Sequence, residues 1–300
     1  MNAHLNRREF VKTAVLAASV TQMNWLKSAF AATGGSTVIV VTGTDVGRML
    51  EKGITELGGW KAFVNPGGSV TLKPNAAWAS LPEQGGNTDP VLVGTCIAAC
   101  RTAGASRVVV PENPCNPPEQ AFSTSGILKA VEEAKGEMYA PREAKHFTNT
   151  DFPDGINLKT AEVVTDVLKT DCLINMPVAK QHGGASLSLS MKNWMGSVKD
   201  RGYWHRNHLH QCIADFSTLV RPQLVVIDAT RIMLTKGPRG PGELAWPHEI
   251  ILSRDPVAAD AYASTLFKKQ PFDIEYIKRA HEMGIGCGAL DKIEIVRIEV

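Results

Sequence analysis

The sequence predicts an α/β fold, with a mixed, mainly parallel sheet that carries helices on both faces. Short apolar runs rich in β-branched residues, such as TVIVVT at 37–42, recur between segments with helical spacing. The runs follow one another at intervals of roughly 20–40 residues, which leaves room for a crossover helix between parallel strands. Two expected helices begin at Asp-Pro pairs, 89–90 and 255–256, where the aspartate caps the helix and the proline occupies its first turn.

The composition is that of an ordinary globular protein with a sizeable core. The 300 residues are 44% hydrophobic and 21% charged. Neither an internal repeat nor a low-complexity tract interrupts the chain, and we expect a single α/β domain over residues 37–300.

The first half of this domain alternates strand and helix patterns. The expected strands are 37–42, 70–73, 107–110 and a short one at 138–139. The expected helices are 46–57, which stops at a Gly-Gly pair, and 90–103, which stops at a single glycine. Residues 119–135 are expected to contain a helix interrupted around 123–126, and 163–168 fits either a strand or a helix.

The second half continues the alternation. The expected strands are 172–176, 224–228, 248–252 and 293–300, and the expected helices are 208–220, 256–267 and 273–283. Pro177 is expected to end the first of these strands, so that Lys180 to His182 lie on a loop. Residues 235–243, rich in Gly and Pro, are expected to form a loop that covers the site.

The first residues have the features of an export signal. Arg7-Arg8 precede an uncharged segment at 13–26, and Ala29-Phe30-Ala31 fits a small-x-small cleavage site. We therefore expect residues 1–31 to be a twin-arginine signal peptide and residues 32–36 to be a linker. The twin-arginine export machinery would then be a partner, and the mature protein would be periplasmic. The segment is too short and too weakly apolar for a permanent membrane span. The alternative is an amphipathic helix with a chance Arg-Arg pair.

Net charge argues against a nucleic-acid partner. Residues 1–31 contain four basic residues and one acidic residue, and their removal turns the net charge from +2 into about −1. The mildly basic balance therefore belongs to the expected signal peptide.

Polar side chains follow several of the expected strands. Lys73 and Asn75 follow one strand, Glu112-Asn113 another and Lys180–His182 a third, and Asp228 ends a fourth. Ligands of open α/β sheets bind beyond the carboxyl ends of the strands. This convergence predicts a ligand site at one edge of the sheet.

The segment 180–196 (KQHGGASLSLSMKNWMG) is the expected centre of that site. Lys180, His182 and Lys192 could form a cationic pocket for a carboxylate or phosphate, with His182 as general acid/base. Asn193 would bind the ligand together with Lys73, Asn75 and Asp228. The alternative is a solvated basic loop with a buried pair between a lysine and an acid.

The segment 204–212 (WHRNHLHQC) is the densest group of metal-capable residues. His208 and His210 would share one face in a strand, whereas His208 and Cys212 would share one in a helix. Histidine with cysteine suits a transition metal. Histidines that merely line a helix start are the alternative. The six cysteines contain no C-x-x-C pair, so an iron–sulfur motif is absent and the cofactor is left open.

Taken together, these elements resemble the domain of unknown function 362 family over residues 37–299. The matching elements are Lys73-Pro-Asn75, Asn175-x-Pro177 with Lys180-x-His182, Lys192-Asn193-x-x-Gly196, the downstream His210, the strand-end Asp228, Gly237-Pro238 and the DPVAAD run at 255–260. The resemblance implies an α/β fold and a set of candidate positions, but no established reaction. Some relatives carry ferredoxin-type cysteine clusters, which this chain lacks.

The sequence thus favours an exported enzyme that acts on a small anionic molecule, with Lys, His and a possible metal at the site. A non-catalytic periplasmic metal- or ligand-binding accessory protein of a redox system is the alternative.

Overall fold

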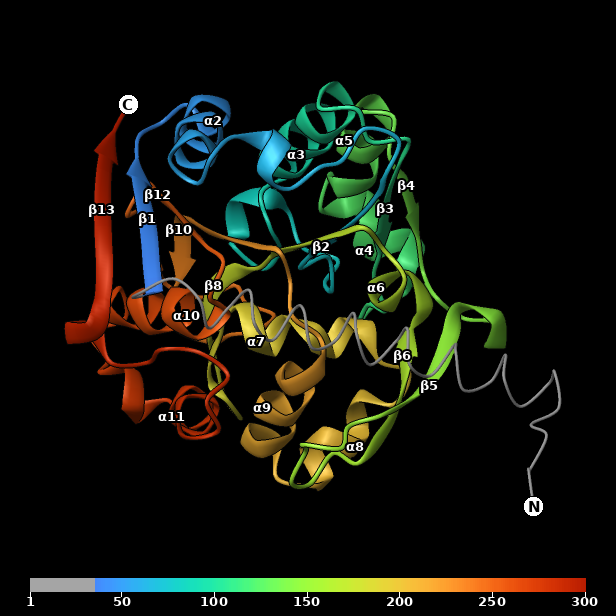
Figure 1. Ribbon diagram of the computed structural model, residues 1–300, viewed down its shortest axis with the longest axis vertical. Coiled ribbons are helices and arrows are strands. Elements are labelled where there is room, and N and C mark those ends of the chain that lie inside the picture. The colour runs from blue at the N-terminus through green and yellow to red at the C-terminus, as the bar shows by residue number, and fades with distance from the viewer. Residues whose placement is uncertain (1–35) are drawn as a thin grey trace, which may run out of the picture. The chain divides into compact units, whose positions relative to one another are not determined.

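The strand residues alternate between two hydrophobic cores, one on each face of a central sheet. In β1 (Ser36–Thr42), Val38 and Val40 pack into one core, and Ile39 and Val41 pack into the other. Successive side chains of a strand point to opposite faces, so a run of apolar residues requires cover on both. Figure 1 shows the computed structural model of the chain, which describes residues 36–300.

The central sheet is mixed and mainly parallel. Its strand order is β13-β1-β12-β10-β7-β2-β3-β4, and along this path only β12 runs antiparallel to its neighbours within the described residues. Strand β8 pairs with β10 and β9, β11 pairs with β10, and β5 and β6 form a separate antiparallel pair. Besides β1, the strands are β2 (Ser69–Pro74), β3 (Arg107–Pro111), β4 (Glu137–Tyr139), β5 (Phe147–Asp151), β6 (Thr160–Val164), β7 (Cys172–Met176), β8 (Val178–His182), β9 (Ser186–Ser188), β10 (Leu224–Met233), β11 (Leu244–Ala245), β12 (Glu249–Ser253) and β13 (Ile293–Glu299).

Helices cover both faces of this sheet. One core receives buried residues of α2 (Val46–Glu56), α3 (Pro90–Thr102), α4 (Pro118–Thr124) and α5 (Ile127–Glu133). The other receives residues of α6 (Thr165–Leu168), α7 (Ser190–Asn193), α8 (Arg201–Arg206), α9 (Leu209–Leu219), α10 (Pro256–Thr265) and α11 (Glu275–Glu282). In Figure 1, α2, α3 and α5 lie on one side of the strands, and α10, α9 and α11 lie on the other. The α/β class expected from the sequence is therefore confirmed.

Most of the expected elements are present. The interrupted helix in 119–135 is α4 followed by α5, with the break at Ser125-Gly126, and 163–168 ends β6 and forms α6. Asp89 and Asp255 cap α3 and α10 through bonds that their carboxylates accept from backbone N–H groups.

Two expectations were wrong, and both concern β10. Lys180 to His182 do not lie on a loop, since they belong to β8. Asp228 does not end its strand, because β10 continues to Met233. The long β10 pairs first with β7 and then with β8, and the carbonyl of Pro177 accepts a bond from the Asp228 N–H at 2.8 Å. Proline lacks only the donor, so its carbonyl still joins the ladder across the point where a strand end was expected.

The expected signal peptide, residues 1–31, and most of the expected linker lie outside the described residues, while Ser36 is the first residue of β1. Within residues 36–300, no helix combines the length and apolarity needed to cross a bilayer.

Candidate functional site

A cavity of about 260 Å³ lies between the segments that follow β2 and β3 and the residues of β8 and α7. The polar side chains that line it are Asn75, Glu112, Cys115, Lys180, His182, Ser188, Lys192, Asn193, Arg201 and His205. Of the nine site residues expected from the sequence, the structure brings five together here, namely Asn75, Lys180, His182, Lys192 and Asn193. The other four, Lys73, Asp228, His208 and His210, do not line the cavity.

Lys73 is engaged in a buried ion pair beside the cavity. Its ammonium lies 2.9 Å from Glu112 Oε2 and donates to the Pro74 carbonyl at 2.8 Å, while the Ala76 N–H also donates to Oε2. Burial lowers the pKa of Lys73, and Glu112 opposes this effect. The charge of Lys73 is therefore compensated within the protein by Glu112.

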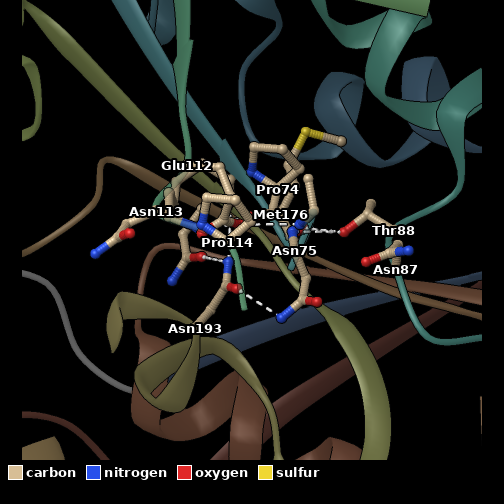
Figure 2. A network of polar contacts seen from close by, with 12 residues as sticks. Pro74, Asn75, Asn87, Thr88, Glu112, Asn113, Pro114, Met176 and Asn193 are labelled. Atoms are coloured by element: carbon tan, nitrogen blue, oxygen red, sulfur yellow. Dashed lines mark hydrogen bonds and ion pairs between the residues drawn. The ribbon is translucent and has the colours of Figure 1, made fainter. Parts of the chain in front are cut away.

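A chain of amide groups fixes the position of Lys180. Its ammonium donates to Asn75 Oδ1, Asn75 Nδ2 donates to Asn193 Oδ1, and Asn193 Nδ2 donates to Asn175 Oδ1. Figure 2 shows Asn75 and Asn193 directed at one another. Most hydrogen-bonding groups of these amides are taken up by one another, so their main effect is to orient Lys180. The three amides come from the residue after β2, from β7 and from α7.

Lys180 and Lys192 are buried, and neither has a carboxylate within salt-bridge distance in residues 36–300. Lys180 donates to two neutral oxygens, Asn75 Oδ1 and the Gly86 carbonyl. Burial, followed by the neighbouring Lys192, lowers the pKa of Lys180 to about 7, and burial lowers that of Lys192 to about 8. A buried cation without a counter-ion is costly. An anion in the cavity would supply the missing partner.

Asp260 holds α7, and with it Lys192, in place. Its carboxylate accepts the N–H groups of Ser190 at 2.8 Å and Met191 at 3.1 Å, which open the short helix. Carboxylates stabilise helix N-termini in this way. Asp260 therefore positions the Lys192 backbone, and burial raises the pKa of its carboxyl to about 7.

The protonation state of His182 follows from its hydrogen bonds. Its Nδ1 accepts N–H groups from Gly184 at 3.0 Å and Ala185 at 3.1 Å, where the chain turns from β8 into β9. Nδ1 therefore carries no proton, and a neutral ring must carry it on Nε2. Burial, followed by Lys192, lowers the pKa of His182 to about 3. His182 is a neutral hydrogen-bond donor in this tautomer, without the Nε2 lone pair that a general base or metal ligand needs.

Asp228 is buried in a different network. It accepts the Asp89 N–H and the Thr230 hydroxyl, and its Oδ2 lies 3.5 Å from an Arg231 nitrogen. Burial raises the pKa of its carboxyl. Asp228 thus connects β10 to the start of α3 rather than contributing to the cavity.

The two histidines proposed as metal ligands do not come together with other ligands. His208 is exposed and precedes α9 with φ 57°, while His210 lies 3.8 Å from Glu275 Oε2 and stacks on Tyr276. Across residues 36–300, no three His, Cys, Asp or Glu side chains form a group that could hold a metal ion.

Sequence reasoning missed Arg201 and Cys115. Arg201 donates to Cys115 Sγ at 3.1 Å, to Asn113 Oδ1 at 3.3 Å and to the Pro114 carbonyl at 2.6 Å. The signal was Asp200, which caps α8 through the Tyr203 N–H and so sets the direction of Arg201. His205, on the same helix, stacks on His182 with ring centroids 6.3 Å apart.

The fold and site define an α/β protein with a cationic cavity beside the carboxyl ends of parallel strands. The chain belongs to the family described as Domain of unknown function (DUF362), whose model matches residues 70–265. The resemblance noted in the sequence is thereby confirmed.

The chain is also similar to two known proteins. The chain is 22% identical over 246 residues to the thylakoid-associated protein sll1697 of Synechocystis sp., covering 78% of this chain and 74% of that protein. Among solved structures it is similar to the lactate racemase apoprotein of Thermoanaerobacterium thermosaccharolyticum, with a TM-score of 0.40 and 10% identity. That match covers 70% of this chain and spans about half, 54%, of the other.

Proposed function

We propose that the cavity binds a small organic anion and that the protein is an enzyme acting on it. The observation that carries this proposal is the pair of buried lysines, Lys180 and Lys192, that line one cavity without a carboxylate partner. Proteins pair buried charges within the chain or with a ligand, because an isolated buried ion is strongly unfavourable. A carboxylate or phosphate is the ligand that such a site lacks.

The neighbouring groups suit an oxygen-rich ligand. Arg201 and Lys192 both contribute positive charge. The Glu112 carboxylate on the cavity wall is paired with Lys73 through Oε2, while its Oε1 has no hydrogen-bond partner among the described residues. His182 offers a neutral N–H that can donate to a ligand oxygen without adding charge. The cavity of about 260 Å³ limits the ligand to a small molecule.

Replacing Lys192 by methionine tests the proposal. The ligand-free variant should be more stable to urea by about 3 kcal/mol at neutral pH, because a buried unpaired charge is removed and the apolar stem is kept. Small carboxylates and phosphate should raise the melting temperature of the wild type but not of Lys192→Met.

Lys129→Met, at an exposed helical site, is the matched control and should behave as the wild type in the anion titration. If anions stabilise Lys192→Met as much as the wild type, the cavity is not their site. Incubating the bound anions with protein and following them by NMR separates the two candidate roles, since an enzyme converts one of them and an accessory binding protein returns them unchanged.

We also propose that the mature protein is periplasmic and that residues 1–31 direct it there. The support is the Arg7-Arg8 pair, the uncharged segment after it and the small-residue cleavage site. In cell fractionation, Arg7→Lys/Arg8→Lys should retain the full-length chain in the cytoplasm, whereas the control Lys27→Arg should be exported and shortened. Normal export of the double variant would refute the twin-arginine route.

A further inference from the structure

The lysines near the cavity differ in what holds their ammonium groups. Lys73 is paired with a carboxylate and does not line the cavity. Lys192 lines it, and within residues 36–300 its Nζ makes no hydrogen bond or ion pair. Lys180 is bonded by two oxygens, both neutral: Asn75 Oδ1 and the Gly86 carbonyl. The three are therefore suited to three different tasks.

The contacts of Lys180 are those that would orient a neutral amine. A neutral amine has two N–H donors and one lone pair. If its two N–H groups point at the Asn75 and Gly86 oxygens, the lone pair points away from both. The backbone is fixed as well, since Lys180 pairs with Ser188 of β9 and Met233 of β10. Lys180 is thus a buried, immobilised amine that lines the cavity.

We propose that Lys180 is a nucleophile that forms an imine with the carbonyl group of a small 2-oxo acid, whose carboxylate lies against Lys192 and Arg201. The inference rests on the proposed function of the cavity as an anion site and names the class of anion. The nucleophile and the cations share one small cavity, so their ligand must carry its anionic group close to its reactive carbon. A 2-oxo acid fits because its carboxylate is bonded directly to its carbonyl carbon.

The chemistry needs no further reactant. The Lys180 lone pair forms a bond to the carbonyl carbon, and the carbonyl oxygen becomes the hydroxyl of a carbinolamine. The C–O bond then breaks, and the oxygen leaves as water with the two hydrogens of the amine. Protonation of the imine nitrogen gives an iminium ion, whose N–H can donate to the Asn75 or Gly86 oxygen that Lys180 already contacts.

The protonation of the two lysines supports this division of tasks. With a pKa of about 7, Lys180 is about half neutral at pH 7, roughly a thousandfold more than an unperturbed lysine. Lys192, with a pKa of about 8, is mostly charged at that pH and suits the carboxylate. Desolvation and a neighbouring cation are the known means of activating an amine nucleophile.

Reductive trapping tests the proposal. The full chain is incubated with pyruvate at pH 7 and borohydride is added, which fixes any imine as a stable amine, and the modified lysine is located by peptide mass spectrometry. We expect one saturable adduct on Lys180, formed about tenfold or more faster than on the exposed Lys129 because of its larger neutral fraction. Excess propionate, which has the carboxylate but no ketone, should compete, and Lys180→Arg should leave only surface background.

The position of the adduct in the wild-type protein tests the proposal even if Lys180→Arg does not fold. An adduct on Lys192 alone, adducts only on exposed lysines, or none at all would overturn the proposal. If propionate still stabilises the wild type but not Lys192→Met while no adduct forms on Lys180, the anion site stands and only the imine chemistry fails. If neither occurs, both proposals fall.

Discussion

Binding of an anion to the cavity is expected to take up protons from solution. The pKa of Lys180 is about 7 and that of Lys192 about 8, both below the usual 10.5, because burial disfavours the charged forms. A bound carboxylate that has no ketone to react with Lys180, such as propionate, restores the charged forms and raises both pKa values. At pH 7.5 Lys180 is about three-quarters neutral and Lys192 about one-quarter, so binding should take up about one proton. At pH 6 both are almost fully charged, and the uptake should fall to about a tenth of a proton.

Isothermal titration calorimetry measures this uptake from the apparent enthalpy of binding in buffers of different ionisation enthalpy. The direction of these pKa shifts also determines how the stability of the folded protein changes with pH. Since the folded-state pKa of each lysine is depressed, the ligand-free protein should gain stability as pH rises from about 7 to 10, and stabilisation by the anion should shrink over the same range. A buffer-independent enthalpy at pH 7.5, or an uptake larger at pH 6 than at pH 7.5, would refute the assignment to lysines. The second result would indicate a histidine.

Three further predictions concern the walls of the cavity. Glu112→Gln should lower the free energy of unfolding in urea by about 3–5 kcal/mol, because Lys73 loses its carboxylate partner; a loss below about 1 kcal/mol would show that the pair is dispensable. Gly196→Ala would place a Cβ 1.9 Å from Glu112 Oε1, so it should lower the free energy of unfolding by about 1–3 kcal/mol and weaken anion binding. The control Gly183→Ala has open space around it and should change that free energy by about 0.5 kcal/mol or less. By ¹⁵N NMR, His182 should stay in its Nε2–H tautomer from pH 5 to 8, and a titration midpoint near its usual pKa would contradict its bonding to Gly184 and Ala185.

The sequence predicted most of the fold because its strongest patterns are local. The β-branched run of β1 and the Asp-Pro helix starts at 89–90 and 255–256 act within a few residues of themselves. The strand end predicted at Pro177 was wrong because a proline ends a strand only where no neighbouring strand continues the pairing. Whether the strand resumes as β8 is decided by the length of β10, about 50 residues further along the chain.

The positive charge of the site could be predicted from the sequence, but the ion pair between a lysine and a carboxylate could not. Lys180, His182 and Lys192 belong to one segment, so their proximity could be inferred. Which lysine is paired with a carboxylate could not be inferred, because the partner of Lys73 is Glu112, which is 39 residues away and directly follows β3. The tautomer of His182 likewise depends on the backbone of a tight turn, which no residue pattern specifies on its own.

The position of β1 in the sheet has a consequence for the order of folding. Both of its neighbours, β12 and β13, come from the last fifth of the chain, and Thr37 contacts Glu294 across 257 residues. During synthesis β1 is therefore made long before either partner strand. Until then its backbone has no neighbouring strand and its apolar side chains are not covered. Contacts this distant slow folding, and an unpaired apolar strand invites association with other chains. The pairing of β1 on both edges can therefore be completed only after β13 has been synthesised.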